Sequence, residues 1–311
     1  MSYTVFHIDG GAGRVIAAIP ALLKYHKNNP QDDFKILVHG WDTLLWGIPE
    51  LQERVFNPDN KGTFENIVYG CKRIIAPEPY REPAYFKQEI SLAEAFDVCI
   101  NETTDHKDLT APVLVLNKME EKFAANVIED VRNQQKKEIT VVIQPYGRGA
   151  KVERGHIIDE ASRSLDTASY ILLCKKLATK YNLIYFGEKD FAVNEDTYTV
   201  KVQADLRGWA AIIESSDYFI GCDSVGQHMA RAFNKPGTVI FGSTFPINTS
   251  YPDHFQILEK QGIKKYSPIR IANIDCHLAD RYNDRLMDFT EEEIHEMFLK
   301  IVSDIEKKVK K

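Results

Sequence analysis

Short runs of β-branched and apolar residues alternate along this sequence with longer stretches of helical periodicity. This alternation is typical of parallel sheets covered by helices, because parallel strands need long crossover connections. Two series of strands are predicted, one at residues 3–9, 34–39, 66–69, 96–101 and 112–116, the other at 139–144, 182–187, 217–221 and 237–242. The sequence therefore predicts an α/β protein with two doubly wound, Rossmann-like domains.

The predicted boundary between the domains follows a polar stretch of helical periodicity at 119–137, rich in Glu, Asn, Gln and Lys. We place it near residue 137, which gives domains of residues 1–137 and 138–289. Thr290 and Glu293 form a T-x-x-E capping box, so a closing helix is expected over 290–311. That helix can pack back on the first domain.

Composition limits the classes of protein that fit. The 311 residues include 39 Lys+Arg and 45 Asp+Glu, which gives a formal net charge of -6. Because the protein as a whole is acidic, it could bind a polyanion only at a locally basic patch of its surface. The five cysteines lack metal-ligand spacing, which indicates reduced thiols. No apolar stretch approaches the ~18 residues of a membrane span, and the first residues do not form a signal peptide. We expect a cytoplasmic protein without a transmembrane segment.

A glycine-rich turn follows the first predicted strand. Gly10, Gly11 and Gly13 stand between Asp9 and Arg14, ahead of a helix of small residues. Glycines let the backbone turn sharply and approach a ligand closely. The spacing matches neither the P-loop nor the G-x-G-x-x-G fingerprint of dinucleotide sites. The turn is therefore either a ligand-binding loop or a plain tight connection.

A second strand-to-helix turn carries more polar groups. An apolar strand ending at Gly221 runs into Asp223, Ser224, Gly226 and His228 at the start of the next helix. The amides and dipole of a helix N-terminus attract phosphate at the carboxyl edge of a parallel sheet. Asp223 alone would be an ordinary cap and His228 alone a packed core histidine. Their coincidence with Ser224 and Gly226 favours an anion-binding site.

This second turn also carries a resemblance to a known family. The residues at 223–228, followed by F-G-x-T-x-P at 241–246, resemble the nucleotide-sugar site of the bacterial heptosyltransferases, glycosyltransferase family nine, although the glycine stands one place later than in that family. Residues 13–22 and 204–213 are similar to two further segments of the family. The resemblance implies the GT-B fold, with two domains facing across a cleft, the first binding the acceptor and the second a nucleoside-diphosphate sugar.

The resemblance also implies roles for individual residues. The family's diphosphate and ribose contacts correspond to Arg163 and Glu188, each of which is otherwise a surface charge at the end of a helix or strand. Where the family has its proposed general base this sequence has Arg14, and an arginine cannot act as a base at neutral pH. Asp9 is our first choice of general base. Its alternative role is to accept hydrogen bonds from the amides of its own turn. Glu102 is the second candidate for the base.

The implied chemistry is transfer of a sugar from a nucleoside-diphosphate sugar, with a UDP-sugar favoured, to an acceptor hydroxyl. The charge that builds on the leaving diphosphate needs a metal ion or fixed cations and dipoles. The sequence has no D-x-D metal motif, whereas the helix start at Ser224 with Arg163 or Arg148 can supply cations and dipoles. We expect a metal-independent enzyme with no cofactor besides its sugar nucleotide.

The acceptor hypothesis rests on a stretch at 69–87 in which aromatic and basic residues alternate among prolines, including Lys72, Arg73, Tyr80 and Arg81. Such a loop suits base stacking and phosphate contacts. Phage enzymes that glycosylate hydroxymethylcytosine are also GT-B proteins, so double-stranded DNA with that base is the hypothetical acceptor. A lipopolysaccharide heptosyltransferase-like enzyme and a non-catalytic sugar-nucleotide binding protein stay open as alternatives, as does an ordinary solvated loop at 69–87.

Overall fold

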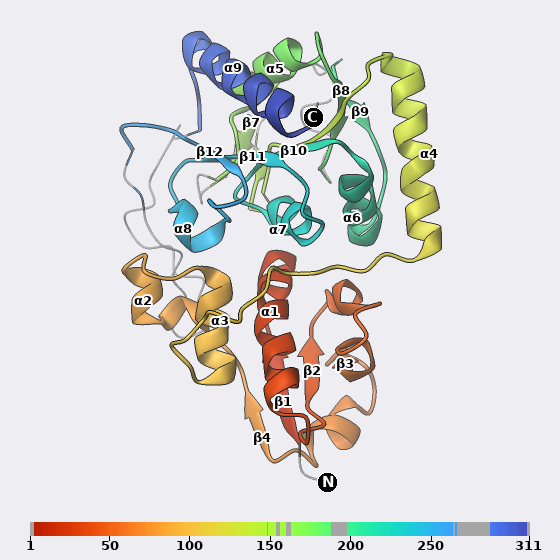
Figure 1. Cartoon of the computed structure of the whole chain (residues 1–311), viewed down its shortest axis with the longest axis vertical. Helices are drawn as coiled ribbons and strands as arrows, with labels where there is room; N and C mark the ends of the chain where they lie inside the picture. The colour runs from red at the N-terminus through yellow and green to blue at the C-terminus, as the bar shows by residue number, and fades with distance from the viewer. Residues whose placement is uncertain are drawn as a thin grey trace. The chain divides into compact units, whose positions relative to one another are not determined.

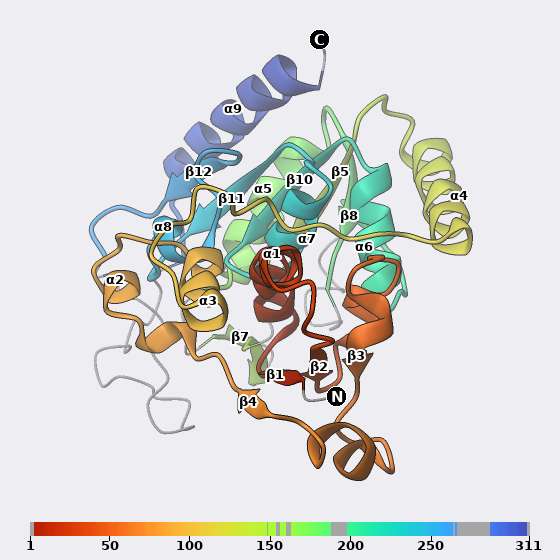
Figure 2. The same cartoon turned by 60° about the horizontal axis from the view of Figure 1, so that its bottom comes forward.

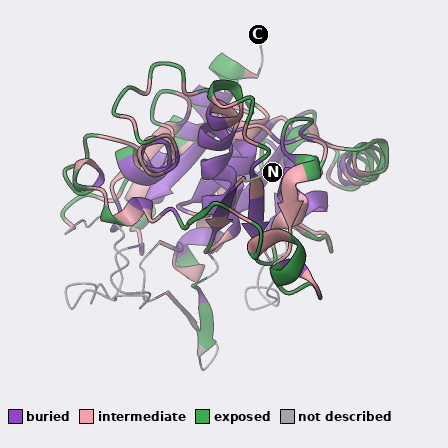
Figure 3. Ribbon diagram, turned by 90° about the horizontal axis from the view of Figure 1, so that it is seen from below, coloured by how far each residue is buried: buried purple, intermediate pink, exposed green. Residues whose placement is uncertain are grey.

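The computed structural model describes residues 3–147, 149–153, 156–159, 163–187, 198–263, 265 and 287–309. Among them the chain divides into two compact units, one ending at Asn117 and the other beginning at Lys118 (Figure 1). Each unit contains its own parallel sheet, whose strands are mostly buried (Figure 3). The α/β class and the two doubly wound units expected from the sequence are confirmed.

The first unit is built on a four-stranded parallel sheet in the order β3-β2-β1-β4. Helices α1 and α3 lie side by side (Figures 1 and 2). The strands are β1 (Thr4–Ile8), β2 (Lys35–Val38), β3 (Val55–Phe56) and β4 (Arg73–Ile75), and the helices are α1 (Ala12–Asn28), α2 (Pro83–Phe86) and α3 (Leu92–Asn101). Short 3₁₀ turns at Asp42–Leu45, Gln52–Arg54 and Pro79–Arg81 and a π-helical turn at Phe64–Val68 connect them.

Three of the five strands predicted in this unit are wrong. Residues 66–69 belong to the π-helical turn, and 96–101 lie in helix α3. Leu92, Phe96 and Ile100 are buried at four-residue spacing, so one face of a helix, and not alternate faces of a strand, meets the core. The capping box of Ser91, which accepts a hydrogen bond from the Glu94 amide and whose own amide donates to the Glu94 carboxylate, starts this helix. Residues 112–116, the third, form neither helix nor strand.

The second unit has a six-stranded parallel sheet in the order β12-β11-β10-β5-β8-β9 and a separate antiparallel pair, β6-β7. All four strands predicted for this half are confirmed as β5, β8, β10 and β11. The strands are β5 (Thr140–Gln144), β6 (Lys151–Glu153), β7 (His156–Ile158), β8 (Asn182–Tyr185), β9 (Val200–Lys201), β10 (Tyr218–Cys222), β11 (Gly237–Phe241) and β12 (Gln256–Glu259). The helices are α4 (Lys118–Gln135), α5 (Thr167–Leu177), α6 (Leu206–Ser215), α7 (Val225–Ala232), α8 (Pro246–Thr249) and α9 (Glu291–Lys308).

Helix α4 groups with the second unit, so the division lies at Asn117 and not near residue 137. Although its sequence is mostly polar, α4 has a narrow apolar face that is buried and consists of Ala124, Ile128 and Val131. Near its start Glu120 accepts two hydrogen bonds, of 2.6 and 2.7 Å, from the guanidinium of the buried Arg207 on α6. A bidentate pair of this kind fixes the two helices against each other.

Helix α9 begins at the expected capping box and packs on α5 and β11, so it belongs to the second unit, whereas the sequence analysis allowed it to pack back on the first domain. Its apolar face, including Ile294, Ile301 and Ile305, joins the core formed by the second sheet. Asp304 lies on the same side, where it accepts a 2.5 Å hydrogen bond from the hydroxyl of Tyr218 on β10. The last helix is therefore part of this core.

We expect Tyr218→Phe to lower the free energy of unfolding by about 1–3 kcal/mol, because the buried Asp304 carboxylate and the Thr238 hydroxyl each lose one hydrogen-bond partner. Urea unfolding followed by circular dichroism measures the change. Tyr69→Phe is the control, since Tyr69 is 81% exposed. Equal stability of the two variants would contradict a structural role for this contact.

Candidate functional site

The second sheet reverses its strand order between β5 and β10. Strand β5 comes first in the chain, β8 and β9 follow on one side of it, and β10, β11 and β12 lie on the other. Connections that leave the carboxyl ends of β5 and β10 therefore diverge, and open α/β sheets bind ligands at such a point. Gln144 of β5 stands opposite Gly221 of β10 at this edge.

The side chain of Gln144 links β5 to the start of α7. Its amide nitrogen donates to the Ser224 hydroxyl at 3.2 Å, and its carbonyl oxygen accepts from the Gly226 amide at 2.9 Å. A Cβ at position 226 would lie 2.4 Å from that oxygen, so only glycine permits the contact. The Gly226 amide is thus used within the protein. In the described part of the chain, the amides of the half-buried Ser224 and Val225 form no hydrogen bond and are left for a ligand.

Asp223 faces inward and is 4% exposed. Its carboxylate accepts hydrogen bonds from the Gln227 amide at 3.0 Å and from the Thr244 hydroxyl at 2.9 Å. Burial raises the pKa of Asp223 above its ordinary value, although Arg163 and Thr244 oppose this. The carboxylate therefore joins the ends of β10, β11 and α7 into one polar cluster.

Arg163 is brought to the same cluster by the segment that precedes α5. One guanidinium nitrogen lies 3.9 Å from the Asp223 carboxylate. The neighbouring Ser164 hydroxyl accepts from the Gly147 amide at 2.9 Å and donates to Asp159 at 2.5 Å, which fastens this segment beside the end of β5. The arginine places a positive charge close to the open end of α7.

His228 is buried on α7, and its Nδ1 lies 2.9 Å from the Tyr251 hydroxyl. Burial lowers the pKa of His228 to about 4. The imidazole is therefore neutral at physiological pH, so it can offer a hydrogen bond but no positive charge.

Five of the sequence-predicted donor residues thus gather at one place, Arg163, Asp223, Ser224, Gly226 and His228, while Arg148 and Glu188 lie outside the described residues. The sequence analysis missed Gln144 and Ser164. Gln144 could have been found as the one polar residue at the carboxyl end of an apolar strand.

The first sheet reverses its order between β1 and β4, and the glycine-rich turn follows β1 at the carboxyl edge. Gly10 has a φ of 103°, and its carbonyl accepts from the Trp41 indole at 3.1 Å. Asp9 is exposed, and its carboxylate accepts from the Gly10 amide at 2.6 Å. The turn-stabilising role considered for Asp9 is therefore present, and the side chain also remains open to solvent.

Arg14 occupies the space between this turn and the segment that follows β4. It is 6% exposed, lies 3.1 Å from the Glu78 carboxylate and donates to the Pro77 carbonyl at 3.3 Å. Its guanidinium stacks over the rings of Tyr80, at 4.8 Å, and Phe96, at 5.5 Å. Arg14 therefore has a packing and charge-pairing role, and Tyr80 is covered by it.

Glu102 lies at the other end of this sheet, because the strand predicted to carry it to the carboxyl edge is helix α3. Its carboxylate is 3.4 Å from Arg73, which is paired with Thr4 at the amino ends of β4 and β1. Asp9 follows Thr4 by five residue steps along β1, roughly 16 Å at the usual rise per residue. Glu102 and Asp9 therefore do not share a site.

The segment at 69–87 is not one surface, because β4 divides it. Lys72 and Arg73 lie at the amino edge of the sheet, whereas Tyr80 and Arg81 follow the carboxyl end of β4. Tyr85, one of the aromatic residues of the stretch at 69–87, is fully buried and is not available for stacking. The glycines at 10, 11 and 13 share an edge with Tyr80 and Arg81 only.

Solved structures provide the comparison with known proteins, since no family model and no curated protein matches this sequence. ADP-heptose lipopolysaccharide heptosyltransferase II of E. coli aligns over 96% of this chain and 99% of its own, with TM-score 0.65 and 14% identity. A glycosyltransferase of family 9 from Veillonella parvula aligns over 83% and 86%, with TM-score 0.60 and 12% identity. The dodecameric, iron-containing glycosyltransferase TibC of enterotoxigenic E. coli aligns over 97% and 80%, with TM-score 0.60 and 11% identity.

The fold is therefore that of the GT-B glycosyltransferases, as the sequence resemblance implied. Within the described ranges, no helix is long and apolar enough to cross a membrane.

Replacing Arg14 by Met should lower the free energy of unfolding by about 2–3 kcal/mol, because Glu78 loses its buried partner. Lys27→Met, at an exposed position of the same helix, is the matched control. Chemical denaturation of both proteins measures the difference, and a change no larger than that of the control would show that Arg14 is dispensable for packing.

Proposed function

We propose that this protein is a glycosyltransferase that moves a sugar from a nucleoside-diphosphate sugar to an acceptor hydroxyl. The observation that carries the proposal is the open N-terminus of α7 at the reversal of the second sheet, with Arg163 beside it. Helix amides and a guanidinium at such an edge are suited to a diphosphate. The GT-B fold supports the same activity.

In this proposal the diphosphate binds the amides of Ser224 and Val225, and Arg163 neutralises part of the charge that builds as the sugar leaves. The fixed dipole and cation take the place of a metal ion, so transfer is expected to continue in the presence of EDTA. Gln144 and Asp223 position these groups and do not touch the reacting atoms. His228, being neutral, contributes a hydrogen bond at most.

Val225→Pro tests the phosphate contact directly. Proline lacks the amide hydrogen but is tolerated in the first position of a helix, and Ser224 before it already has the extended backbone, φ -152° and ψ -176°, that proline favours. We expect affinity for the donor to fall about tenfold or more, with stability equal to that of the matched control Val225→Ala.

A thermal-shift panel of nucleoside-diphosphate sugars, beginning with UDP-sugars, identifies the donor for that measurement. Undiminished donor binding by a folded Val225→Pro protein would contradict this phosphate site. Tight binding of a donor by the wild type without turnover on any acceptor would identify the protein as a sugar-nucleotide binding protein.

Asp9 is the proposed general base, because its carboxylate is exposed beside the glycine turn and Glu102 lies at the opposite edge of that sheet. Removal of a general base typically costs a factor of about 100 or more. We therefore expect Asp9→Asn to lower kcat by about that factor while donor affinity stays unchanged. Initial rates of nucleoside-diphosphate release measure this change. An unaltered kcat would show that a group other than Asp9 removes the proton from the acceptor hydroxyl.

For the acceptor we propose the hydroxyl of a saccharide. The names of the structural neighbours support it, and the basic residues expected to contact DNA phosphates are divided between the two ends of β4. A panel of saccharide acceptors and of duplex DNA with hydroxymethylcytosine distinguishes the two. Transfer to the DNA alone would restore the nucleic-acid hypothesis.

A further inference from the structure

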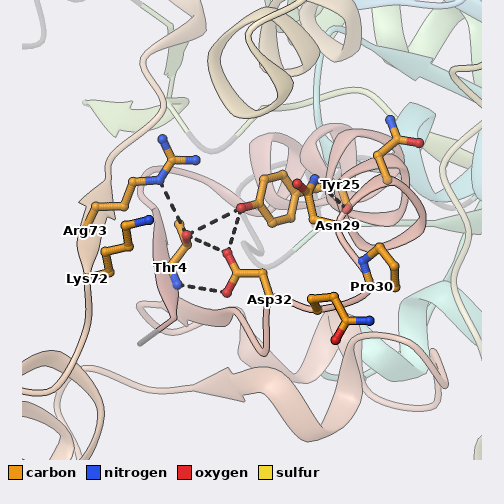
Figure 4. A pocket seen from close by; sticks show the side chains of 9 residues that line it. Thr4, Tyr25, Asn29, Pro30, Asp32, Lys72 and Arg73 are labelled. Carbon is orange, nitrogen blue, oxygen red and sulfur yellow. Dashed lines mark hydrogen bonds between the residues drawn. The ribbon is translucent and has the colours of Figure 1, made fainter. Parts of the chain in front are cut away.

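The first unit contains a groove that the proposed transfer reaction does not use. It encloses about 510 Å³ at the amino edge of the first sheet, opposite the edge that carries the glycine turn (Figure 4). This volume lies within the range of roughly 300–1,000 Å³ that is usual for small-molecule sites. Its lining residues come from β1, from α1 and the turn after it, and from the start of β4: Thr4, Tyr25, Asn28, Asn29, Pro30, Gln31, Asp32, Lys72 and Arg73.

The floor of the groove is a preformed hydrogen-bond network. Asp32 accepts from the Thr4 amide at 3.1 Å, from the Thr4 hydroxyl at 2.7 Å and from the Tyr25 hydroxyl at 2.8 Å (Figure 4). Burial alone would raise the pKa of Asp32, but these hydrogen bonds and the charge of Arg73 outweigh it and lower the pKa. Thr4 and Tyr25 are 3% and 5% exposed, so this floor is rigid, and the carboxylate is already satisfied by the protein.

Hydrogen-bonding groups at the end of α1 also find partners within the protein. The backbone amide and side-chain amide of Asn29 both donate to the Tyr25 carbonyl, at 2.9 and 3.0 Å. The side-chain carbonyl of Asn29 and the amides of Asn28 and Gln31 remain at the wall of the groove. Such groups can exchange hydrogen bonds with hydroxyls of a polar ligand.

Two cations stand on the opposite wall. Arg73 donates from Nε to the Thr4 hydroxyl at 3.4 Å and lies 3.4 Å from Glu102 at one terminal nitrogen. Lys72 is exposed and makes no ion pair with any residue that the structure describes. Glu102 is 72% exposed, so solvent screens its charge. Within the lining, Lys72 and Arg73 thus stand against the single carboxylate of Asp32, which leaves a formal charge of one positive unit beside a set of neutral amides.

We propose that this groove binds a small phosphomonoester, a molecule of about the size of a monosaccharide phosphate. Lys72 and Arg73 hold the phosphate, and the amides of Asn28, Asn29 and Gln31 meet the hydroxyls. Two adjacent cations suit a single phosphate group better than a polyanion, which needs a longer line of charge. The groove is built from residues of the first unit alone, and the donor site from residues of the second.

Isothermal titration of the full-length protein with glucose 6-phosphate, inorganic phosphate and glucose tests the proposal. We expect saturable binding of glucose 6-phosphate, weaker binding of phosphate and no binding of glucose. Lys72→Met and Arg73→Met should each weaken glucose 6-phosphate binding about tenfold or more. Lys61→Met, an exposed lysine outside the groove, should leave it unchanged.

Arg163→Met separates this site from the donor site, because it should weaken binding of a nucleoside diphosphate and spare that of glucose 6-phosphate. Amide NMR spectra provide a readout that does not depend on the heat of binding, with chemical-shift changes expected at residues 28, 29, 31, 32, 72 and 73. Arg73→Lys keeps the charge if Arg73→Met proves unstable. The proposal is overturned if glucose 6-phosphate does not bind, if the Lys72 and Lys61 variants behave alike, or if Arg163→Met removes its binding.

Discussion

The candidate donor site depends on one side chain, Gln144, at the point where the second sheet reverses its strand order. Its two polar atoms reach Ser224 and Gly226 and so hold the first turn of α7 against the end of β5. A glutamine can do this because it carries a donor and an acceptor on one rigid amide group. The helix start is thereby fixed with its first amides directed away from the protein's own acceptors, as a phosphate site requires.

The second unit was largely predictable from the sequence because its strands are continuous apolar runs, as buried parallel strands are. The residue cluster at 223–228 was also found, since the strand, the cap residues and the helix follow one another in sequence. Gln144 was missed because its partners lie far away in the chain, at 224 and 226, and its place at the end of an apolar strand is the one local signal for it. Ser164 was missed because no sequence pattern links it to the Gly147 amide.

The first unit was predicted less well for a physical reason. Its strands are short, and helix α3 has a composition that also suits a strand. The capping box of Ser91 and Glu94 and the burial of Leu92, Phe96 and Ile100 on one face distinguish the two. Because of this error, Glu102 was expected at the carboxyl edge of the sheet, whereas it lies at the amino edge beside Arg73. Arg14 shows a related limit: its position in the motif suggested chemistry, whereas its burial against Glu78 and Phe96 assigns it to packing.

Helix α9 has a consequence for biosynthesis. Its residues Ile294, Ile301 and Ile305 complete a core whose first strand begins at Thr140, and Asp304 satisfies Tyr218 within it. The part of the apolar surface that α9 covers therefore stays exposed during translation until this helix has left the ribosome. Exposed apolar surface of this kind favours aggregation, and a chain that stops before residue 294 would leave the surface that α9 covers on α5 and β11 exposed.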